Sequence, residues 1–382
     1  MKGRKTALYI LFLVGLLLPV VQMWTRWVPQ PTLRGAYEKH ARPQLTAKSW
    51  FSGEFQEAYE LYFNDSVGFH PQLTRLYNMA RFRLFHESNA NNIVFGIDDY
   101  LYEQDYIDAH YGTDYIGMDS IRAQVLRVRQ LQDDLAAQGK TLIVFLAPSK
   151  ADYLPEYIPV SQRKSHTDST NHRQFSRLLQ AEGVNVIDYN THYQSLKATT
   201  PYPLYPQYGI HYSHYGMLQA TDSLIRYIER IRHCQLPRIV VDRYEVSHKP
   251  QFTDYDLGSV LNMAGRPLKS FPLCYPVWHW SEERAPEPLK MIAVADSYFW
   301  AMFDIGLESR CMDGSFWYYN SSVYPATFDK ATFTSELDIA KEIGDADIVL
   351  IMSTTPGLRT FSWGFLDNAR RAMQNDPGDG GK

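Results

Sequence analysis

The sequence predicts an α/β protein in which helices cover both faces of a parallel β-sheet, preceded by one N-terminal helix that spans a membrane. Continuous apolar runs such as 141–147 and 291–294 are typical of strands that are buried on both faces. Amphipathic helical patterns separate these runs, as expected for a parallel sheet. The chain has 382 residues, of which 45% are hydrophobic and 21% charged, so it can bury a substantial core.

The N-terminus has the charge and hydropathy pattern of a membrane anchor. Lys2, Arg4 and Lys5 precede an apolar run over 7–24, and these 18 residues are just enough to cross hydrocarbon as a helix. The basic end is expected to stay in the cytoplasm. We therefore expect a cytoplasmic tail over 1–6, a transmembrane signal anchor over 7–24, and a main domain in the periplasm or otherwise outside the cytoplasm.

Two other interpretations of this segment are weaker. A cleaved signal peptide would have a shorter apolar core followed by small residues, whereas the run here ends in the bulky segment 20–27. Trp24 and Trp27 fit the far membrane interface of a retained anchor. A helix buried in a soluble protein is disfavoured because the run is terminal and flanked by charge.

The rest of the chain divides into three predicted parts. Residues 25–46 are polar, with three prolines between 29 and 46, and are expected to form a juxtamembrane spacer. Residues 47–375 form the main domain, and residues 376–382 a flexible C-terminal tail.

Helical and strand patterns alternate along this domain. The clearest helix covers 121–138, where Val125, Val128, Leu131 and Leu135 share one face and Gly139 follows as a C-terminal cap. The elements expected in chain order are a helical pattern over 49–86, a strand at 93–95, a helix over 121–138, a strand at 141–147, a helix over 171–181, a strand at 184–187, a helix over 216–232, and strands at 291–294 and 348–352.

Charge and cysteine content exclude several classes of protein. There are 38 Lys and Arg residues against 42 Asp and Glu, a formal net charge of −4, so nucleic acid is not an expected partner. Cys234, Cys274 and Cys311 lie far apart without a CxxC pair, which argues against a zinc knuckle, a redox motif or a disulfide-rich scaffold. At most one disulfide could form.

A candidate nucleophile follows one of the predicted strands. In open α/β sheets the reactive groups lie at the carboxyl ends of the strands. Ser297 comes just after the strand at 291–294, and a helix following it would direct free N–H groups toward an oxyanion. The same Asp-Ser pattern is also typical of a helix N-cap, which is the structural alternative for Ser297.

The candidate base is His211, because a serine hydroxyl needs a nearby base and neutral histidine is the usual one. It lies just ahead of the predicted helix over 216–232, in a loop that could reach the same sheet edge. A metal site formed with His214 is the alternative, since a spacing of three directs both rings to one side of a helix. Gly209 and Gly216 disfavour a helix there, and no Asp, Glu or Cys completes the set locally. No metal and no cofactor are therefore expected.

Motifs along most of the chain resemble the extracytoplasmic SGNH-hydrolase-like proteins related to alginate O-acetyltransferases, the AlgX and AlgJ group. The matching segments are 68–70, 76–85, 93–102, 147–150, 153–155, the histidine motif 209–213 and the serine motif 295–297. The histidine precedes the serine, which is the circularly permuted order of this group, whereas ordinary SGNH esterases have the serine first. The resemblance implies an SGNH-hydrolase-like parallel sheet with Ser297 and His211 as catalytic residues.

Two positions depart from the family pattern. The family has an Asp two residues before the histidine to orient the imidazole, and this chain has Gly209 there. Loss of such a carboxylate in another serine hydrolase costs about 10⁴ in rate. Asp188, at the end of the strand at 184–187, is the best-placed substitute and the third predicted catalytic residue, with a structural role as its alternative. Ala295 replaces the family's glycine, a milder change because alanine fits any negative φ.

The resemblance implies a membrane-anchored O-acetyltransferase that modifies a cell-envelope or exported polysaccharide through a serine acyl-enzyme. Its expected partners are a polysaccharide acceptor, a multi-spanning membrane O-acyltransferase that supplies the acetyl group, and the membrane itself.

Only 85 residues follow Ser297, too few for a separate carbohydrate-binding module besides the end of the sheet. Aromatic clusters such as 317–319 and 278–280 could stack on sugar rings, although packing is their more common role. Two alternatives remain open: an acetyl esterase of the same fold, and a catalytically impaired scaffold subunit of an acetylation complex.

Overall fold

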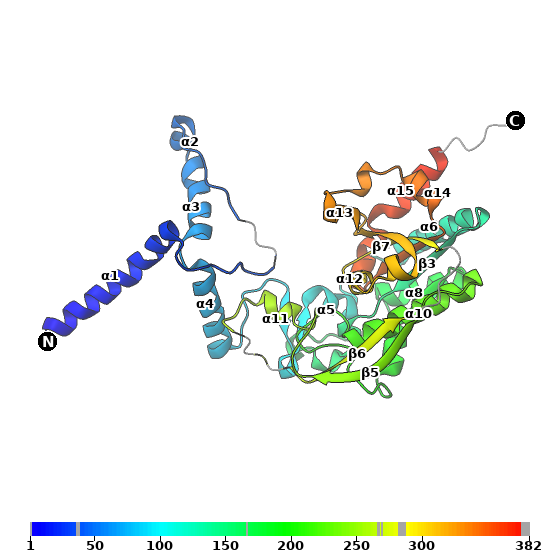
Figure 1. Cartoon of the computed structure of the whole chain (residues 1–382), viewed down its shortest axis with the longest axis horizontal. Helices are drawn as coiled ribbons and strands as arrows, with labels where there is room; N and C mark the ends of the chain where they lie inside the picture. The colour runs from blue at the N-terminus through cyan, green and yellow to red at the C-terminus, as the bar shows by residue number, and fades with distance from the viewer. Residues whose placement is uncertain are drawn as a thin grey trace. The chain divides into compact units, whose positions relative to one another are not determined.

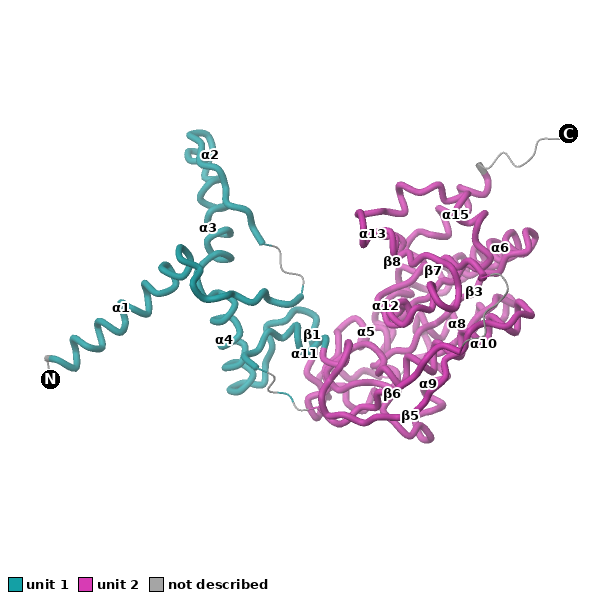
Figure 2. The backbone as a smooth tube through the Cα atoms, in the orientation of Figure 1, with its two compact units in different colours: residues 1–93, 256–269 teal, residues 94–255, 270–382 magenta. Residues whose placement is uncertain are grey.

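The computed structural model describes residues 2–35, 39–165, 167–265, 268, 270–281 and 288–375. The chain forms two compact units, coloured separately in Figure 2. Unit 1 consists of residues 1–93 and 256–269, and unit 2 of residues 94–255 and 270–382. The predicted boundaries of the main domain at 47 and 375 stay a prediction, and the predicted tail over 376–382 lies outside the described residues.

Unit 1 contains α1 (Lys2–Thr25), α2 (Ala47–Ser52), α3 (Glu54–Ser66) and α4 (His70–Phe85). The apolar side chains of α1 are exposed, and by length and composition its segment Gly3–Thr25 could cross a membrane. The single helical pattern expected over 49–86 is instead three helices. It is interrupted at Gly53, with φ 86°, and around Phe69, with φ 63°, because both residues adopt the left-handed conformation.

Close backbone packing joins α1 to the turn between α3 and α4. The N–H of Gly68 donates to the carbonyl of Pro19 at 3.1 Å. A Cβ at position 68 would lie 2.1 Å from that carbonyl oxygen, so only glycine fits. Gln22, which interrupts the apolar run, is fully buried and bonds both backbone groups of Val28. The chain therefore turns back against the end of α1.

Unit 2 is built on a six-stranded sheet with the order β4-β3-β10-β7-β8-β9. Its first five strands are parallel, and β9 is antiparallel to β8. The strands are β3 (Thr141–Leu146), β4 (Val186–Asp188), β7 (Lys290–Ala295), β8 (Asp313–Tyr318), β9 (Ser322–Tyr324) and β10 (Ile348–Ser353). The predicted parallel sheet is confirmed. β8 and the short β9 were not predicted.

Helices cover this sheet on both faces (Figure 1). On one face the core joins alternate residues of β3, such as Val144, to Val125 of α6 (Met118–Ala137), Phe175 of α8 (Asn171–Ala181) and Phe365 of α15 (Phe365–Asn375). The intervening residues of β3 face the other way, because side chains alternate along a strand. There Phe145 stacks on Tyr189 of α9 (Tyr189–Leu196), whose hydroxyl lies 3.1 Å from Ser223 of α10 (His214–Arg232). These contacts confirm the α/β fold class.

The remaining elements are shorter or lie beside the sheet. β5 (Ile239–Ser247) and β6 (Leu273–Trp280) form an antiparallel ribbon, which the sequence analysis missed because the polar, mostly exposed β5 lacks a buried apolar run. The three cysteines are unpaired. The other elements are β1 (Ile93–Phe95), η1 (Ile97–Asp99), β2 (Leu101–Glu103), α5 (Gln104–Tyr111), α7 (Lys150–Tyr153), η2 (Pro155–Tyr157), η3 (Val160–Gln162), α11 (Asp256–Val260), α12 (Phe299–Asp304), η4 (Leu307–Cys311), α13 (Ala326–Asp329), η5 (Thr334–Glu336), α14 (Ile339–Asp345) and η6 (Pro356–Gly364).

Candidate active site

Ser297 lies just past the carboxyl end of β7, in the turn that leads into α12. The buried carboxylate of the preceding residue, Asp296, holds this turn. It accepts hydrogen bonds from the N–H of Tyr298 at 3.1 Å and from the N–H and hydroxyl of Thr354 at 2.6 and 2.7 Å. Because Thr354 follows β10, Asp296 ties the serine turn to the neighbouring strand of the sheet.

His211 meets Ser297 although the two residues are 86 positions apart in the chain. Its Nε2 lies 3.0 Å from the hydroxyl oxygen of Ser297. The histidine loop ends at Ser213, the N-cap of α10, whose hydroxyl accepts from the N–H of Gly216 at 3.2 Å and donates to the carbonyl of Pro203 at 2.7 Å. A serine hydroxyl within hydrogen-bond reach of an imidazole is the geometry that nucleophile activation needs.

Two buried tyrosines fix the histidine loop to the serine turn. The hydroxyl of Tyr298 donates to the carbonyl of Ile210, and the hydroxyl of Tyr212 donates to the carbonyl of Tyr298, both at 2.5 Å. Burial raises the pKa of both phenols well above the ordinary value, which keeps them protonated as donors. Since Ile210 and Tyr212 flank His211, these bonds hold the imidazole from both sides.

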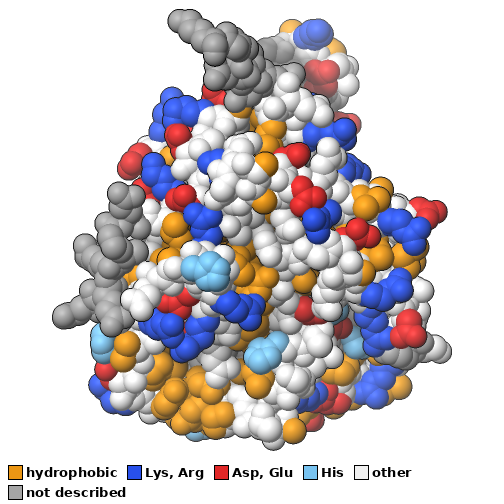
Figure 3. Space-filling model, turned by 90° about the vertical axis from the view of Figure 1, so that its right-hand side faces the viewer, with side chains coloured by type: hydrophobic (Ala, Val, Ile, Leu, Met, Phe, Trp, Pro, Cys, Tyr) orange, Lys and Arg blue, Asp and Glu red, His pale blue; other side chains and the backbone are white. Residues whose placement is uncertain are grey.

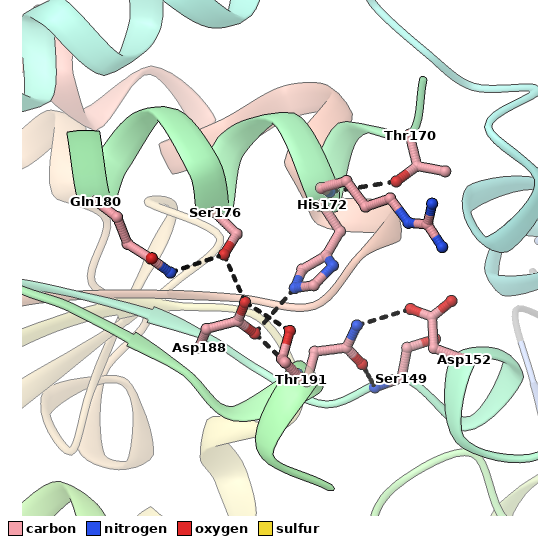
Figure 4. A network of polar contacts seen from close by, with 10 residues as sticks. Ser149, Asp152, Thr170, His172, Ser176, Gln180, Asp188 and Thr191 are labelled. Atoms are coloured by element: carbon pink, nitrogen blue, oxygen red, sulfur yellow. Dashed lines mark hydrogen bonds and ion pairs between the residues drawn. The ribbon is translucent and has the colours of Figure 1, made fainter. Parts of the chain in front are cut away.

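The third predicted catalytic residue, Asp188, has other partners (Figure 4). His172 Nε2 lies 3.0 Å from its carboxylate, the hydroxyl of Ser176 donates at 2.6 Å, and the N–H of Thr191 donates at 2.9 Å. Burial raises the pKa of Asp188, but these three partners outweigh it and hold the pKa well below the usual range. Of the three predicted residues, Ser297 and His211 lie together in the structure, whereas Asp188 pairs with His172.

Backbone packing explains why glycine occupies the position of the family's orienting Asp. A Cβ at Gly209 would lie 2.6 Å from the carbonyl oxygen of Thr253, 2.8 Å from the ring of Pro206 and 3.1 Å from the carbonyl carbon of Asp254. Two of these three neighbours are backbone atoms and cannot rotate away. The segment around Thr253 therefore fills the space that a side chain at position 209 would need.

Tyr319, predicted as part of a possible sugar-stacking cluster and not as a catalytic residue, lies beside Ser297. Burial raises the pKa of its phenol, while contacts with the side chain and backbone of Ser297 lower it. Tyr319, Asn320 and Trp363 all have positive φ, at 50°, 50° and 48°, and the side-chain amide of Asn320 donates to the carbonyl of Trp363 at 3.0 Å. Such backbone strain clusters at functional sites. The signal for Tyr319 in the sequence was its place in the aromatic cluster over 317–319.

Aromatic side chains continue outward from the serine turn. The backbone N–H of Trp300 donates to the carbonyl of Ser297. The indole ring of Trp300 contacts Tyr318, Tyr324 and Phe328 at centroid distances of 5.6, 4.5 and 6.4 Å. Phe328 is 64% exposed. These rings form the candidate acceptor surface: Trp300, Tyr318, Tyr319, Tyr324 and Phe328.

The predicted sugar-stacking cluster over 317–319 divides between core and surface. Trp317 is fully buried and packs edge-on against Phe365, so it is a core residue, whereas Tyr319 is 40% exposed. In the other cluster, Trp278 and Trp280 of β6 pack edge-on against each other at 5.7 Å.

His214 has a different environment from His211. It begins α10 and stacks on Phe252 with ring centroids 4.5 Å apart, and burial lowers its pKa to about 4. Within the described part of the chain, no group of three or more His, Cys, Asp or Glu residues could hold a metal ion. On the face shown in Figure 3, basic and acidic side chains are interspersed.

Comparison with known proteins finds one family model that matches part of the chain, mostly within unit 2. Residues 93–258 match the family model for the SGNH hydrolase-like domain of the acetyltransferase AlgX, which confirms the resemblance predicted from the motifs. The match includes His211 and ends before Ser297, so the serine rests on the geometry described above. A comparison with curated proteins gave no match.

Solved structures show a weaker likeness. The O-acetyltransferase domain of Pseudomonas putida AlgJ is 15% identical, with a TM-score of 0.47, covering 74% of this chain and 99% of that one. Pseudomonas aeruginosa AlgX is 11% identical, with a TM-score of 0.46, covering 76% and 69%. Bacillus cereus PatB1 is 12% identical, with a TM-score of 0.42, covering 71% and 98%.

Proposed function

We propose that the chain, of which residues 93–258 match the SGNH hydrolase-like domain of the acetyltransferase AlgX, is an O-acetyltransferase that acts on a polysaccharide through an acetyl-serine intermediate. The observation that carries this proposal is the 3.0 Å contact between His211 Nε2 and the hydroxyl of Ser297. It favours a catalytic protein over an inactive scaffold, because a base within this distance of a serine has the geometry of an activated nucleophile.

In the first step, His211 Nε2 takes the proton of Ser297 as the serine oxygen attacks the acetyl carbonyl of the donor. The C–O bond to Ser297 forms, and the carbonyl oxygen becomes an oxyanion. As this intermediate collapses, the bond to the donor's leaving oxygen breaks and His211 returns the proton to that oxygen. In the second step, a sugar hydroxyl gives its proton to His211 and attacks the acetyl-serine. Ser297 then leaves with the proton.

The oxyanion needs hydrogen-bond donors that are already in place. We assign this role to the hydroxyl of Tyr319, which contacts the side chain and backbone of Ser297 and whose pKa, raised by burial, keeps it protonated. The partly exposed rings of the candidate acceptor surface offer stacking contacts to the sugar that receives the acetyl group.

The test is Ser297→Ala in the full-length chain, with Ser309→Ala, an exposed serine of η4, as the matched control. Ser297→Ala should abolish acetylation of the polymer in cells while the protein stays folded and membrane-bound. Ser309→Ala should leave acetylation unchanged. Normal acetyl content with Ser297→Ala would reject the catalytic role.

A second assay separates the transferase from an esterase, since the two differ only in which hydroxyl attacks the acetyl-serine. The purified protein would be given a chromogenic acetyl ester with and without an oligosaccharide acceptor. A transferase forms acetylated oligosaccharide at the expense of free acetate. Release of acetate alone at all acceptor concentrations would favour the esterase.

We also propose that α1 is a retained anchor and that the catalytic unit lies outside the cytoplasm, where a multi-spanning membrane O-acyltransferase supplies the acetyl group. The exposed apolar side chains of α1 support this location. A reporter enzyme that is active only in the cytoplasm should be inactive when fused after Lys382. An active fusion would reverse the orientation.

A further inference from the structure

A buried lysine bonds the backbone of the histidine loop. Lys150 begins α7 directly after β3, and its side chain is fully buried. Its ammonium group donates three hydrogen bonds to backbone carbonyls, to Leu101 at 2.8 Å, Gln207 at 2.9 Å and Gly209 at 2.7 Å. An ammonium group has three donors, so these carbonyls satisfy all of them.

Two aromatic rings also contact the ammonium group of Lys150. Its nitrogen lies 5.7 Å from the ring centroid of Tyr100 and 5.3 Å from that of Tyr102, within the range of cation–π attraction. Removing an ammonium group from water costs several kcal/mol, which only well-placed partners offset. A residue that is expensive to bury and fully satisfied by carbonyls fixes the position of those carbonyls.

Two of the three carbonyls belong to the segment that carries His211. Gly209 is two residues before the histidine, and the carbonyl of Gln207 also accepts from the N–H of Leu101 at 3.0 Å. The next carbonyl along the loop, that of Ile210, accepts from Tyr298. Lys150 and Tyr298 therefore bond neighbouring carbonyls of the same loop, Lys150 those of Gln207 and Gly209 and Tyr298 that of Ile210.

We propose that Lys150 is a positioning residue for His211: it fixes the Gln207 and Gly209 carbonyls so that the imidazole Nε2 stays within hydrogen-bond distance of Ser297. It acts through the backbone and does not contact the reacting atoms. The kinetic part of this inference rests on the proposed function, whereas the geometric part concerns only the contact between His211 and Ser297.

The variants are Lys150→Met, which keeps the length of the side chain without its charge, and Lys150→Arg, which keeps the charge in a planar fork unsuited to three converging carbonyls. Lys197→Met is the matched control, because Lys197 donates to the carbonyl of Tyr153 and to Glu156 but to no part of the histidine loop. All are made in the full-length chain and assayed with 4-nitrophenyl acetate over a range of pH.

Lys150→Met should lower kcat about 100-fold with little change in KM, since a displaced base weakens the transition state rather than substrate binding. The acidic limb of the pH profile of kcat/KM should shift as well. Lys197→Met should change neither. A fall in thermal stability with an unchanged pH profile and unchanged kcat per folded molecule would overturn the proposal and leave Lys150 a structural residue.

A double-mutant cycle with His211→Ala gives the sharper test. If Lys150 acts only through His211, then Lys150→Met should have no further effect on the residual activity of His211→Ala. An undiminished 100-fold loss in the His211→Ala background would refute the proposal. If Lys150→Met does not fold, Lys150→Arg takes its place in the double-mutant cycle with His211→Ala.

The NMR resonances of the His211 imidazole nitrogens test the geometric part of the inference separately from the kinetic part. If the protein lacks activity that depends on Ser297, the proposed function fails. The positioning role of Lys150 is still tested by whether Lys150→Arg removes the hydrogen-bond shift of Nε2 seen in the natural protein. An unchanged shift would refute the positioning role, whatever the activity.

Discussion

Restoring the family's aspartate at position 209 should damage this protein rather than activate it. From motif comparison alone, Gly209→Asp supplies the missing carboxylate two residues before His211. The structure predicts the opposite, because the first side-chain atom would lie 2.6 Å from the carbonyl oxygen of Thr253 and 3.1 Å from the carbonyl carbon of Asp254. Backbone atoms at these distances must move, and the loop that carries His211 moves with them.

The steric part alone can be estimated from Gly209→Ala. Overpacking a buried position costs about 1–3 kcal/mol of unfolding free energy. Gly344→Ala is the matched control, because a Cβ there meets no atom within 4 Å and the residue lies inside α14. That change should stabilise the protein by about 0.5–1 kcal/mol. Gly209→Ala should therefore lower the free energy of unfolding, and Gly344→Ala should raise it.

Gly209→Asp adds the burial of a carboxylate, for which the penalty is several kcal/mol unless it is paired. We expect a larger loss of stability than with Gly209→Ala, measured by urea unfolding. We also expect kcat on acetyl ester to fall at least about tenfold, which corresponds to about 1.4 kcal/mol of lost transition-state stabilisation. A Gly209→Asp variant that is as stable as the natural protein and faster would refute this account of the loop.

Three further predictions concern residues around the site. Asp188→Asn should lower the free energy of unfolding by about 3–5 kcal/mol, since it breaks a buried pair with His172, yet leave the pH profile of acetyl transfer unchanged. The pKa of Asp188 is lower in the folded state, so its contribution is present above the unfolded pKa of about 3.9 and is lost as pH falls further; urea unfolding below about pH 4 should show a smaller acid loss in Asp188→Asn than in the natural protein. A changed catalytic pH profile would instead support Asp188 as the orienting carboxylate. Tyr319→Phe should reduce kcat about 10²–10³-fold if the phenol donates to the oxyanion, and single-turnover measurement with acetyl ester would detect it; an unchanged rate would remove Tyr319 from the oxyanion site. Phe328→Ala should raise KM for an oligosaccharide acceptor about 2–10-fold, from a lost stacking contact of about 0.5–1.5 kcal/mol, without affecting hydrolysis of a small acetyl ester. Phe51→Ala, at an 88% exposed ring of α2, is its control, and equal effects of the two variants would contradict an acceptor surface at Phe328.

The periodicity of the sequence was enough to predict the parallel core of unit 2. Uninterrupted apolar runs have one stable environment, between two layers of helices, so β3, β7 and β10 could be identified before any contact was known. The β5-β6 ribbon was missed because β5 mostly faces solvent and carries polar side chains, so it shows no buried apolar run. The helical pattern over 49–86 did not reveal its breaks, since the left-handed conformations at Gly53 and Phe69 depend on local geometry that apolar spacing does not record.

The sequence by itself determined the residue types of the candidate site: a serine after a buried strand and a histidine ahead of a helix, each at a place where a parallel sheet exposes reactive groups. Only the tertiary structure decided which side chains meet. Contacts between residues 86 positions apart depend on the order of strands in the sheet, and side chains reach their partners through packing from several elements. For that reason Asp188, adjacent to the site by sequence reasoning, pairs with His172. Tyr319, just after β8, lies beside Ser297, and Lys150, at the start of α7, bonds the backbone of the histidine loop, although neither contact could be read from apolar spacing.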